Sequence, residues 1–261
     1  MSGFRFAKDY ALHRLKGKTR HGTHSPFVYR LVDKVIYDFS KKKVYDEVET
    51  LRRELLSDNR VINVTDLGAG SHLNNNKQKK VSAIAKNALK SPRLAQLLYR
   101  LVADQQPANI IELGTSLGIT SVYLKKAVPD AMLYTLEGCP ETAGIAKETL
   151  TKAGIDNYEL IVGNFDGTFP KVLDCLEKID FVFIDGNHTK EATLRYFEWC
   201  LPKVHEGTLL IFDDIYWSED MKEAWAGIKA HPQVTVTVDL FWIGLVYFRR
   251  GKVREDFVIK F

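Results

Sequence analysis

The stretch IIELGTSLGIT (residues 110–120) decides the fold, because it joins a short apolar strand to a glycine-containing turn and the start of a helix. Glu112 falls at the predicted end of the strand, and Gly114 and Gly118 fall in the turn. Glycine accepts positive φ angles and lets a ligand come close to the backbone. The stretch therefore predicts a strand–turn–helix unit whose turn can hold a ligand.

The same alternation continues from Asn109 onward, which indicates a mostly parallel sheet covered by helices. Seven strands are expected: NIIEL (109–113), MLYTLE (132–137), YELIVG (158–163), DFVFID (180–185), TLLIFD (208–213), VTVTVDL (234–240) and IGLVYFR (243–249). Only Phe241 and Trp242 separate the last two. These must pair antiparallel, because a parallel connection needs a long crossover. The sequence thus predicts an α/β fold with a seven-stranded, mostly parallel sheet and an antiparallel last strand.

Residues 1–107 are expected to form a mainly helical extension that caps the strand ends, and residues 108–261 the α/β domain that contains the sheet. Apolar positions such as Leu31 and Val35 recur at helical spacing in the extension. We expect an exposed, mobile loop at DLGAGSHLNNNKQKK (66–80). Its DLGAGS imitates a strand and a glycine turn, but polar and basic residues follow it instead of an amphipathic helix.

Charge is divided unevenly along the chain, whose net charge is +4. Residues 1–107 hold 21 Lys and Arg against 10 Asp and Glu, and residues 108–261 hold 16 against 23. A basic extension beside an acidic half indicates either an anionic partner or substrate, or two halves that attract one another. In KGKTRHGTHSPFVYRLV (16–32), the side chains placed to reach an anion are Arg20, His21, His24 and Ser25. Alternatively, Ser25 and Pro26 simply begin a helix.

Composition excludes several classes of protein. With 261 residues, 45% hydrophobic and 27% charged, the chain is long enough for one large α/β core and is neither disordered nor fibrous. No apolar run approaches the roughly 20 residues that span a bilayer, so a cytoplasmic protein is expected. Its three cysteines are widely spaced, which predicts reduced structural thiols rather than disulfides or a metal site.

The turn at Gly114 and Gly118 has the spacing GxxxG rather than the GxGxxG that brings a pyrophosphate onto a helix. This difference argues against a dinucleotide. Glu137 ends the next strand, 23 residues after Gly114, where a carboxylate can accept both hydroxyls of a ribose. An ordinary turn and a structural glutamate remain the alternative interpretation.

The E-x-G-x-x-x-G turn resembles motif I of the class I S-adenosylmethionine-dependent methyltransferases. The resemblance implies a Rossmann-like methyltransferase fold and S-adenosyl-L-methionine as cofactor. It also implies an adenine contact from Asn164 and Phe165, which follow the third strand. The expected cofactor contacts are Glu112, Gly114, Thr115, Ser116, Gly118, Glu137, Asn164, Phe165 and Asp185. The basic N-terminal segment resembles an extension on uncharacterised bacterial members of the same superfamily.

Three carboxylates, Asp185, Asp213 and Asp214, fall at the carboxyl ends of the fourth and fifth strands, where open α/β sheets bind ligands. They would repel one another unless a cation neutralised them. An oxygen-only ligand set suits Mg²⁺, Ca²⁺ or Mn²⁺, and we expect Mg²⁺. Alternatively, Asp185 binds the methionine part of the cofactor while Asp213 and Asp214 cap a turn.

His188 follows Asp185 by three positions, and Asp213 follows Asp185 by 28. This spacing resembles metal-dependent O-methyltransferases of the catechol and caffeoyl-CoA type and, more closely, of the macrolide-sugar type. The resemblance implies Asp185, Asp213 and Asp214 as metal ligands, with His188 and Asp185 catalytic. Because an imidazole ordinarily has a pKa of about 6.5, a histidine can accept the hydroxyl proton at neutral pH. The catechol type carries lysine at position 188 and asparagine at position 214, which leaves a phenolic substrate open.

The sequence therefore predicts metal-assisted O-methylation of a hydroxylated small molecule, anionic or sugar-containing, by a protein whose oligomeric state, a homodimer included, stays open. One alternative is a metal-independent methyltransferase acting on RNA or another anionic substrate. Another is an NAD(P)-linked oxidoreductase, and a third is an inactive binding module. Nucleic acid is not the expected partner, because the aromatic pattern of common RNA-binding modules is missing from the sequence.

Overall fold

The computed structural model describes residues 3–65, 78–251 and 253–261. The chain forms two compact units. The first unit comprises Met1–Asp38 and Leu176–Phe261, and the second unit comprises Phe39–Cys175. The division predicted after Pro107 stays a prediction. Residues 66–77 of the predicted mobile loop lie outside the described residues.

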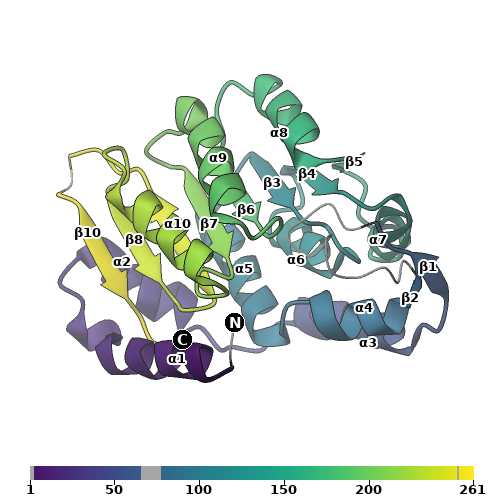
Figure 1. Cartoon of the computed structure of the whole chain (residues 1–261), viewed down its shortest axis with the longest axis horizontal. Helices are drawn as coiled ribbons and strands as arrows, with labels where there is room; N and C mark the ends of the chain where they lie inside the picture. The colour runs from purple at the N-terminus through teal and green to yellow at the C-terminus, as the bar shows by residue number, and fades with distance from the viewer. Residues whose placement is uncertain (1–2, 66–77, 252) are drawn as a thin grey trace. The chain divides into compact units, whose positions relative to one another are not determined.

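The second unit contains three parallel strands with the helices that accompany them (Figure 1). Its elements are α3 (Lys43–Ser57), β1 (Val61–Asn63), β2 (Gln78–Lys80), α4 (Val81–Ala88), α5 (Pro92–Gln105), β3 (Asn109–Leu113), α6 (Ile119–Ala127), β4 (Met132–Glu137), α7 (Pro140–Lys152), β5 (Tyr158–Val162) and α8 (Phe165–Asp174). Helix α8 covers one face of β3, β4 and β5, and α6 lies on the other. Strand β3 is buried along its whole length, as a strand enclosed on both faces must be.

Register in the second unit brings the predicted site residues to one end of the strands. Glu112 of β3 lies opposite Thr135 of β4, and Glu137 of β4 lies opposite Val162 of β5. Helix α5 begins where Ser91 accepts a hydrogen bond from the Leu94 amide and Pro92 follows at the first helical position, which is a favourable helix start. The carboxyl ends of β3 and β4 are thus held side by side.

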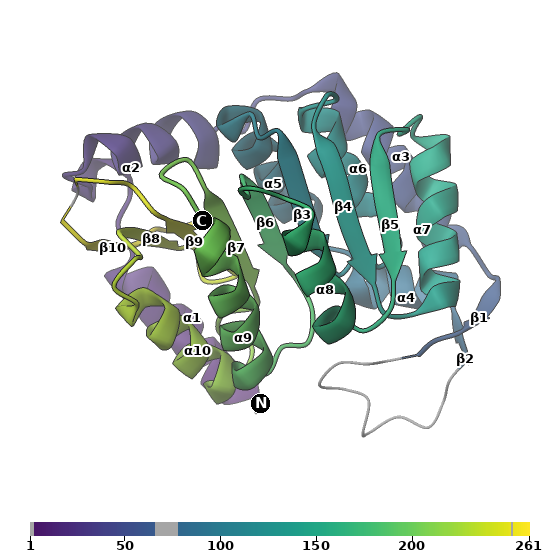
Figure 2. The same cartoon turned by 90° about the horizontal axis from the view of Figure 1, so that it is seen from above.

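The first unit contains five strands among its described residues (Figure 2). Its elements are α1 (Gly3–Lys16), η1 (Arg20–Gly22), α2 (Pro26–Leu31), η2 (Val32–Ile36), β6 (Phe181–Ile184), α9 (Lys190–Cys200), η3 (Leu201–Lys203), β7 (Leu209–Asp213), α10 (Glu219–Ala230), β8 (Val236–Asp239), β9 (Ile243–Tyr247) and β10 (Glu255–Val258). Strands β6 and β7 are parallel. Strand β9 pairs antiparallel with both β7 and β8.

Among the described residues, the strands follow the order β10-β8-β9-β7-β6 within the first unit and β3-β4-β5 within the second unit. The antiparallel pairing of β8 with β9 is confirmed. The predicted count of seven strands is wrong, because β10 adds an eighth strand parallel to β8. The antiparallel strand is therefore not the last. The predicted loop also ends earlier than expected, since Gln78–Lys80 form β2 and pair with β1.

The amino-terminal segment of the first unit is joined to the carboxyl-terminal segment by main-chain hydrogen bonds. The Lys18 amide donates to the Val258 carbonyl at 2.8 Å, and the Lys260 amide donates to the Lys18 carbonyl at 3.0 Å. Ser25 precedes α2 with Pro26 at its start, and Arg20 pairs with Asp33 at 2.7 Å. In the described ranges, no helix is long and apolar enough to cross a membrane.

Candidate active site

The turn between β3 and α6 has the backbone that its glycines predict. Gly114 has a φ of 102°, Gly118 a φ of 83°, and Ser116 between them a φ of 50°. A Cβ at Gly118 would lie 3.1 Å from the Ala146 carbonyl oxygen of α7. Glycine is therefore required at position 118 both for the left-handed conformation and for the close approach of α7.

Glu137, at the end of β4, lies beside this turn. Its Oε2 accepts a hydrogen bond from the Ser116 amide at 2.8 Å, and its Oε1 accepts one from the Cys139 amide at 2.9 Å. The structure thus brings together two predicted cofactor residues that are 21 positions apart. A carboxylate oxygen can accept more than one hydrogen bond, so a group fixed in this way is also of a kind that can accept from a ribose.

Glu112 and Thr115 are enclosed beneath the turn rather than open to solvent. Glu112 is fully buried and Thr115 is 2% exposed. The Glu112 carboxylate accepts from the Ser121 hydroxyl and, at 2.6 Å, from the Thr135 hydroxyl. The Thr135 hydroxyl also lies 2.6 Å from that of Thr115. This network holds the turn, and direct cofactor contacts from these two residues stay a prediction. The sequence analysis missed Ser121 and Thr135, because lone hydroxyls carry no distinguishing pattern.

Asn164 and Phe165 lie where β5 leads into α8. The Asn164 side chain accepts from the Asp166 amide at 2.9 Å and so caps α8. The preceding residue, Gly163, donates its amide to the Glu137 carbonyl at 2.9 Å. These contacts tie the start of α8 to the end of β4. The adenine contact expected from Asn164 and Phe165 remains a prediction.

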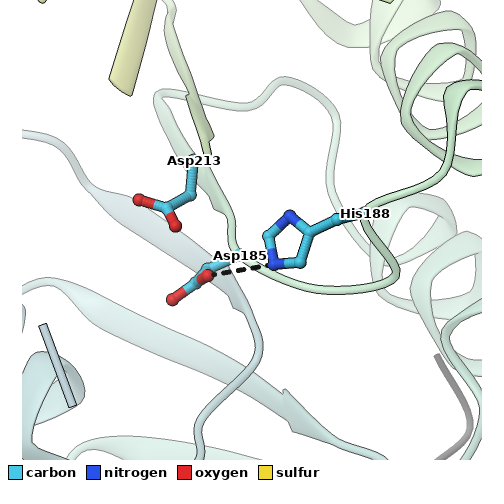
Figure 3. A group of neighbouring side chains, drawn as sticks. All are labelled: Asp185, His188 and Asp213. Carbon is cyan, nitrogen blue, oxygen red and sulfur yellow. Dashed lines mark ion pairs between the residues drawn. The ribbon is translucent and has the colours of Figure 1, made fainter. Parts of the chain in front are cut away.

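The first unit gathers the other predicted residues at the ends of β6 and β7. Asp185 follows β6, and Asp213 ends β7. Asp213 is only 1% exposed. Figure 3 shows the imidazole of His188 and the carboxylates of Asp185 and Asp213 facing a common region. One ligand atom from each of these three residues lies within 4.8 Å of the others. The grouped histidine was predicted as a base rather than as a ligand.

His188 stands between two of the acids. Its Nε2 lies 3.6 Å from Asp185 Oδ1 and 4.0 Å from Asp214 Oδ2. Both separations exceed hydrogen-bond length, so no direct hydrogen bond joins these atoms. Asp214 therefore belongs to the neighbourhood, but the group within 4.8 Å contains His188 in its place.

The loops that carry these groups are fixed by hydrogen bonds of the main chain and of one side chain. Asn187 has a φ of 52° and Asp214 a φ of 53°, a region that Asn and Asp tolerate better than most residues. The Asn187 side-chain amide donates to the Tyr196 hydroxyl at 3.2 Å. The Asp214 amide donates to the Trp242 carbonyl, and the Trp217 amide donates to the Asp214 carbonyl, each at 2.8 Å.

The donor set suits a divalent cation. Carboxylate oxygens are preferred by Mg²⁺ and Mn²⁺, and an imidazole nitrogen widens the choice toward first-row transition metals. Nearby carboxylates repel one another unless a positive charge lies between them. Asp185, His188 and Asp213 therefore fit a bound metal by the chemistry of their side chains and by their mutual distances.

Fold and site together define a class of protein. A mostly parallel sheet with an antiparallel β9, a glycine turn after β3 and a carboxylate at the end of β4 make up the Rossmann-like methyltransferase fold, as the sequence predicts. Residues 111–215 match the family model described as a methyltransferase domain. With the curated relatives described below, this match confirms the resemblance to class I S-adenosylmethionine-dependent O-methyltransferases.

Two relatives illustrate the similarity in sequence. A catechol O-methyltransferase of Niastella koreensis is 30% identical over 128 residues, which cover 48% of this chain and 57% of that protein. A catechol O-methyltransferase of Mycobacterium tuberculosis is 30% identical over 139 residues, which cover 50% and 61%. The chain thus spans about three fifths of the length of these relatives.

Solved structures show the same fold. An O-methyltransferase from Bacillus cereus in complex with SAH superimposes with a TM-score of 0.55 at 22% identity, covering 81% of this chain and 93% of that one. The O-methyltransferase TomG from Streptomyces achromogenes, in complex with SAM, gives a TM-score of 0.58 at 19% identity, covering 85% and 95%. At these identities the likeness concerns the fold alone.

Proposed function

We propose that the protein is an S-adenosylmethionine-dependent O-methyltransferase that acts on a hydroxylated small molecule with the help of a divalent metal. The observation that carries the proposal is the grouping of Asp185, His188 and Asp213 in a chain whose residues 111–215 match the model of a methyltransferase domain. Two carboxylates beside an imidazole form a donor set that a divalent metal can use.

Most of the proposed cofactor contacts belong to the second unit. The turn from Gly114 to Gly118 offers a close backbone approach, and the carboxylate of Glu137, fixed by two amides, accepts the ribose hydroxyls. Asn164 and Phe165 are the proposed adenine contacts, and Asp185 the proposed contact of the methionine part. The relatives crystallised with SAH and SAM support this choice of cofactor.

The acceptor and the metal are assigned to the strand-end acids of the first unit. Asp185, Asp213 and Asp214 hold the metal, and His188 takes the acceptor's hydroxyl proton at Nε2. Bound S-adenosylmethionine supplies an electrophilic methyl group, and a bound divalent ion supplies a Lewis acid that favours loss of the hydroxyl proton. Asp185, 3.6 Å from the imidazole, stabilises His188 once it is protonated.

The acceptor is proposed to be small, hydroxylated, and anionic or sugar-containing. The catechol O-methyltransferases among the relatives support a hydroxyl as the methylated group. The uneven charge, 21 Lys and Arg against 10 Asp and Glu in residues 1–107, supports an anionic acceptor. A location in the cytoplasm remains part of the proposal, and the oligomeric state, a homodimer included, stays open.

Calorimetry with S-adenosylhomocysteine and with NAD separates a methyltransferase from an oxidoreductase. We expect the full-length protein to bind S-adenosylhomocysteine and not NAD. Binding of NAD in preference would reject the proposed function as a whole.

Exhaustive chelation tests whether the proposed reaction requires a divalent metal. A metabolite screen first supplies a methylated acceptor, and the reaction is then repeated after treatment with a chelator and after restoring Mg²⁺ or Mn²⁺. We expect activity to be lost and then recovered. Full activity in the chelated protein would leave a metal-independent methyltransferase and reduce the three aspartates to cofactor and capping roles.

A further inference from the structure

A buried carboxylate in the first unit collects hydrogen bonds from three separate parts of the chain. Asp239, at the end of β8, is 2% exposed. Its Oδ1 lies 3.0 Å from His13 Nε2 of α1, and its Oδ2 accepts from the Tyr216 hydroxyl at 2.9 Å and from Trp225 Nε1 at 3.2 Å. Because a carboxylate only accepts, His13 donates from Nε2. Neither the proposed cofactor contacts nor the proposed metal ligands include any of these residues.

An aromatic layer surrounds this carboxylate. Phe241, which follows β8, has a φ of 74° and donates its amide to Asp239 Oδ1 at 2.9 Å. The Tyr216 ring stacks on Phe241 at 4.7 Å between centroids. From α1, the rings of Phe6 and Tyr10 pack edge-on against Phe241 at 5.1 and 5.0 Å. We call His13, Tyr216, Trp225, Asp239 and Phe241 the Asp239 cluster.

The Asp239 cluster is linked to Asp214 from two sides. On one side, Trp242 follows Phe241, and its carbonyl accepts from the Asp214 amide at 2.8 Å. On the other side, Tyr216 lies two residues after Asp214 and reaches Asp239 with its hydroxyl. Asp213 itself lies opposite Ile243 in the pairing of β7 with β9. The backbone of both acids is therefore fixed to the turn that Asp239 holds.

Left-handed backbone occurs here at two non-glycine positions, and this conformation must be stabilised by its surroundings. Asp214 and Phe241 both have positive φ, a conformation that costs free energy and persists only where the surroundings enforce it. A phenylalanine is a poor residue for this region. The hydrogen bond from the Phe241 amide to Asp239 and the packing of the α1 rings against Phe241 hold the positive φ angle in place.

We propose that Asp239 and His13 are positioning residues through which helix α1 fixes the backbone of Asp213 and Asp214 and thereby sets the affinity of the strand-end acids for a divalent metal. The inference rests on the proposed function, because it presupposes that these acids bind a metal. It gives the amino-terminal helix a role in the metal site without any contact to the metal.

Measurements of metal binding, made without a catalytic assay, test the inference. Electron paramagnetic resonance of Mn²⁺ added to the full-length protein gives its dissociation constant, and calorimetry gives that of S-adenosylhomocysteine. We expect His13→Ala to weaken Mn²⁺ binding by roughly tenfold or more, as the loss of outer-shell support does in metal sites. His13→Gln retains a donor near the same place and is expected to restore most of the affinity. The cofactor constant should stay the same in both variants.

A second His–Asp pair of the first unit serves as a matched control. His205 Nε2 lies 2.9 Å from Asp180 Oδ1, and Asp180 directly precedes β6, at the opposite end of that strand from Asp185. His205→Ala removes a comparable contact and is expected to leave Mn²⁺ binding unchanged. Tyr216→Phe removes a single hydroxyl from Asp239 and is expected to weaken Mn²⁺ binding by about threefold, the usual worth of one hydrogen bond. This milder variant keeps the test valid if His13→Ala does not fold.

The outcomes separate the inference from the proposed function. If the unmodified protein binds Mn²⁺ while His13→Ala and Tyr216→Phe bind it equally well, the positioning role is rejected and the metal site stands. If His205→Ala weakens Mn²⁺ binding as much as His13→Ala, the effect is one of general stability and the positioning role is again rejected. If the unmodified protein binds no Mn²⁺, the metal in the proposed function is rejected, and the positioning role with it.

Discussion

The glycine turn of the second unit and the strand-end acids of the first unit differ in what surrounds their carboxylates. Around the turn, each described carboxylate already accepts hydrogen bonds: Glu137 from two amides, and Glu112 from two hydroxyls. Among the acids, His188 approaches Asp185 and Asp214 only to 3.6 and 4.0 Å. The turn is thus a preformed surface, whereas the acids form a collection of like charges around one imidazole.

This difference indicates how each region would bind its ligand. A site whose polar groups already accept hydrogen bonds binds by shape and by its spare lone pairs, so its affinity changes little with salt or metal. A site of neighbouring carboxylates gains most when a cation enters, because the cation removes their repulsion. Substitutions in the two regions should therefore have separable effects.

The largest effect is expected for Asp213→Asn, which removes a charge from the buried end of β7 and keeps the shape of the side chain. Metal-dependent turnover should be abolished, while the dissociation constant of S-adenosylhomocysteine should stay nearly unchanged. Turnover assays with added Mg²⁺ and calorimetry check the two halves of the statement. Asp180→Asn, at the other end of β6, is the control. Turnover retained in Asp213→Asn would contradict the assignment of Asp213 to the metal site.

His188→Ala should lower kcat by roughly 10² to 10⁴, the usual contribution of a general base. The loss should shrink at high pH, where hydroxide or the ionised acceptor replaces the base. Profiles of kcat against pH and Mn²⁺ binding by paramagnetic resonance are the measurements. An unchanged Mn²⁺ constant identifies a base, whereas a weakened one identifies a ligand, in keeping with the position of His188 beside Asp185 and Asp213.

Glu137→Ala should weaken cofactor binding by about 1.5 to 3 kcal/mol, the range for hydrogen bonds to a charged group. Calorimetry with S-adenosylhomocysteine measures the change, and Mn²⁺ binding by the strand-end acids should not move. Glu137→Gln, which keeps one acceptor oxygen, is expected to lose less. Equal affinity in Glu137→Ala and in the unmodified protein would remove Glu137 from the site.

Gly118→Ala tests whether the turn is preformed by its backbone. Placing a Cβ in the left-handed region costs about 1 to 2 kcal/mol, and here it also meets the Ala146 carbonyl at 3.1 Å. The control is Gly154→Ala, because Gly154 has a φ of 67° and no atom within 4 Å of an added Cβ. Thermal unfolding should therefore show a larger loss for Gly118→Ala. Equal losses would show that only the φ angle matters.

The smallest effect is expected for charges outside both regions. Arg60 pairs with Asp58 and Glu148 and lowers the pKa of both carboxyl groups. Stability from these pairs is present above the ordinary carboxyl pKa and is lost as pH falls through the lowered values. Because Arg60 is half exposed, Arg60→Gln should cost less than about 1 kcal/mol. Chemical denaturation should show a larger difference at pH 7 than at pH 3.

Much of the fold follows from the sequence for a physical reason. Strands buried on both faces are typically continuous apolar runs, and β6 and the first four residues of β7 are of this kind. Strand β10 escapes the pattern, because Glu255–Val258 begins with two acids and is only partly buried. Such a strand depends on the partner it pairs with, here β8, rather than on its own residues.

The candidate site is predictable to a lesser extent. The order of strand ends along the chain brings Asp185 near Asp213, and the spacing brings His188 with them. The orientation of these side chains depends on left-handed backbone at Asn187 and Asp214. No sequence pattern predicts that conformation. The Asp239 cluster is harder still to foresee, since His13 and Asp239 are 226 positions apart.

The left-handed backbone of Asp214 also limits how the site can change during evolution. Aspartate, asparagine and glycine tolerate this region, and most other residues do not. Exchanging aspartate for asparagine alters the charge of the site by one unit at no cost to the backbone, so the neighbourhood of His188 can be retuned by a single base change. A saturation library at position 214 should accordingly yield folded protein chiefly with these three residues, and activity would then rank them by charge.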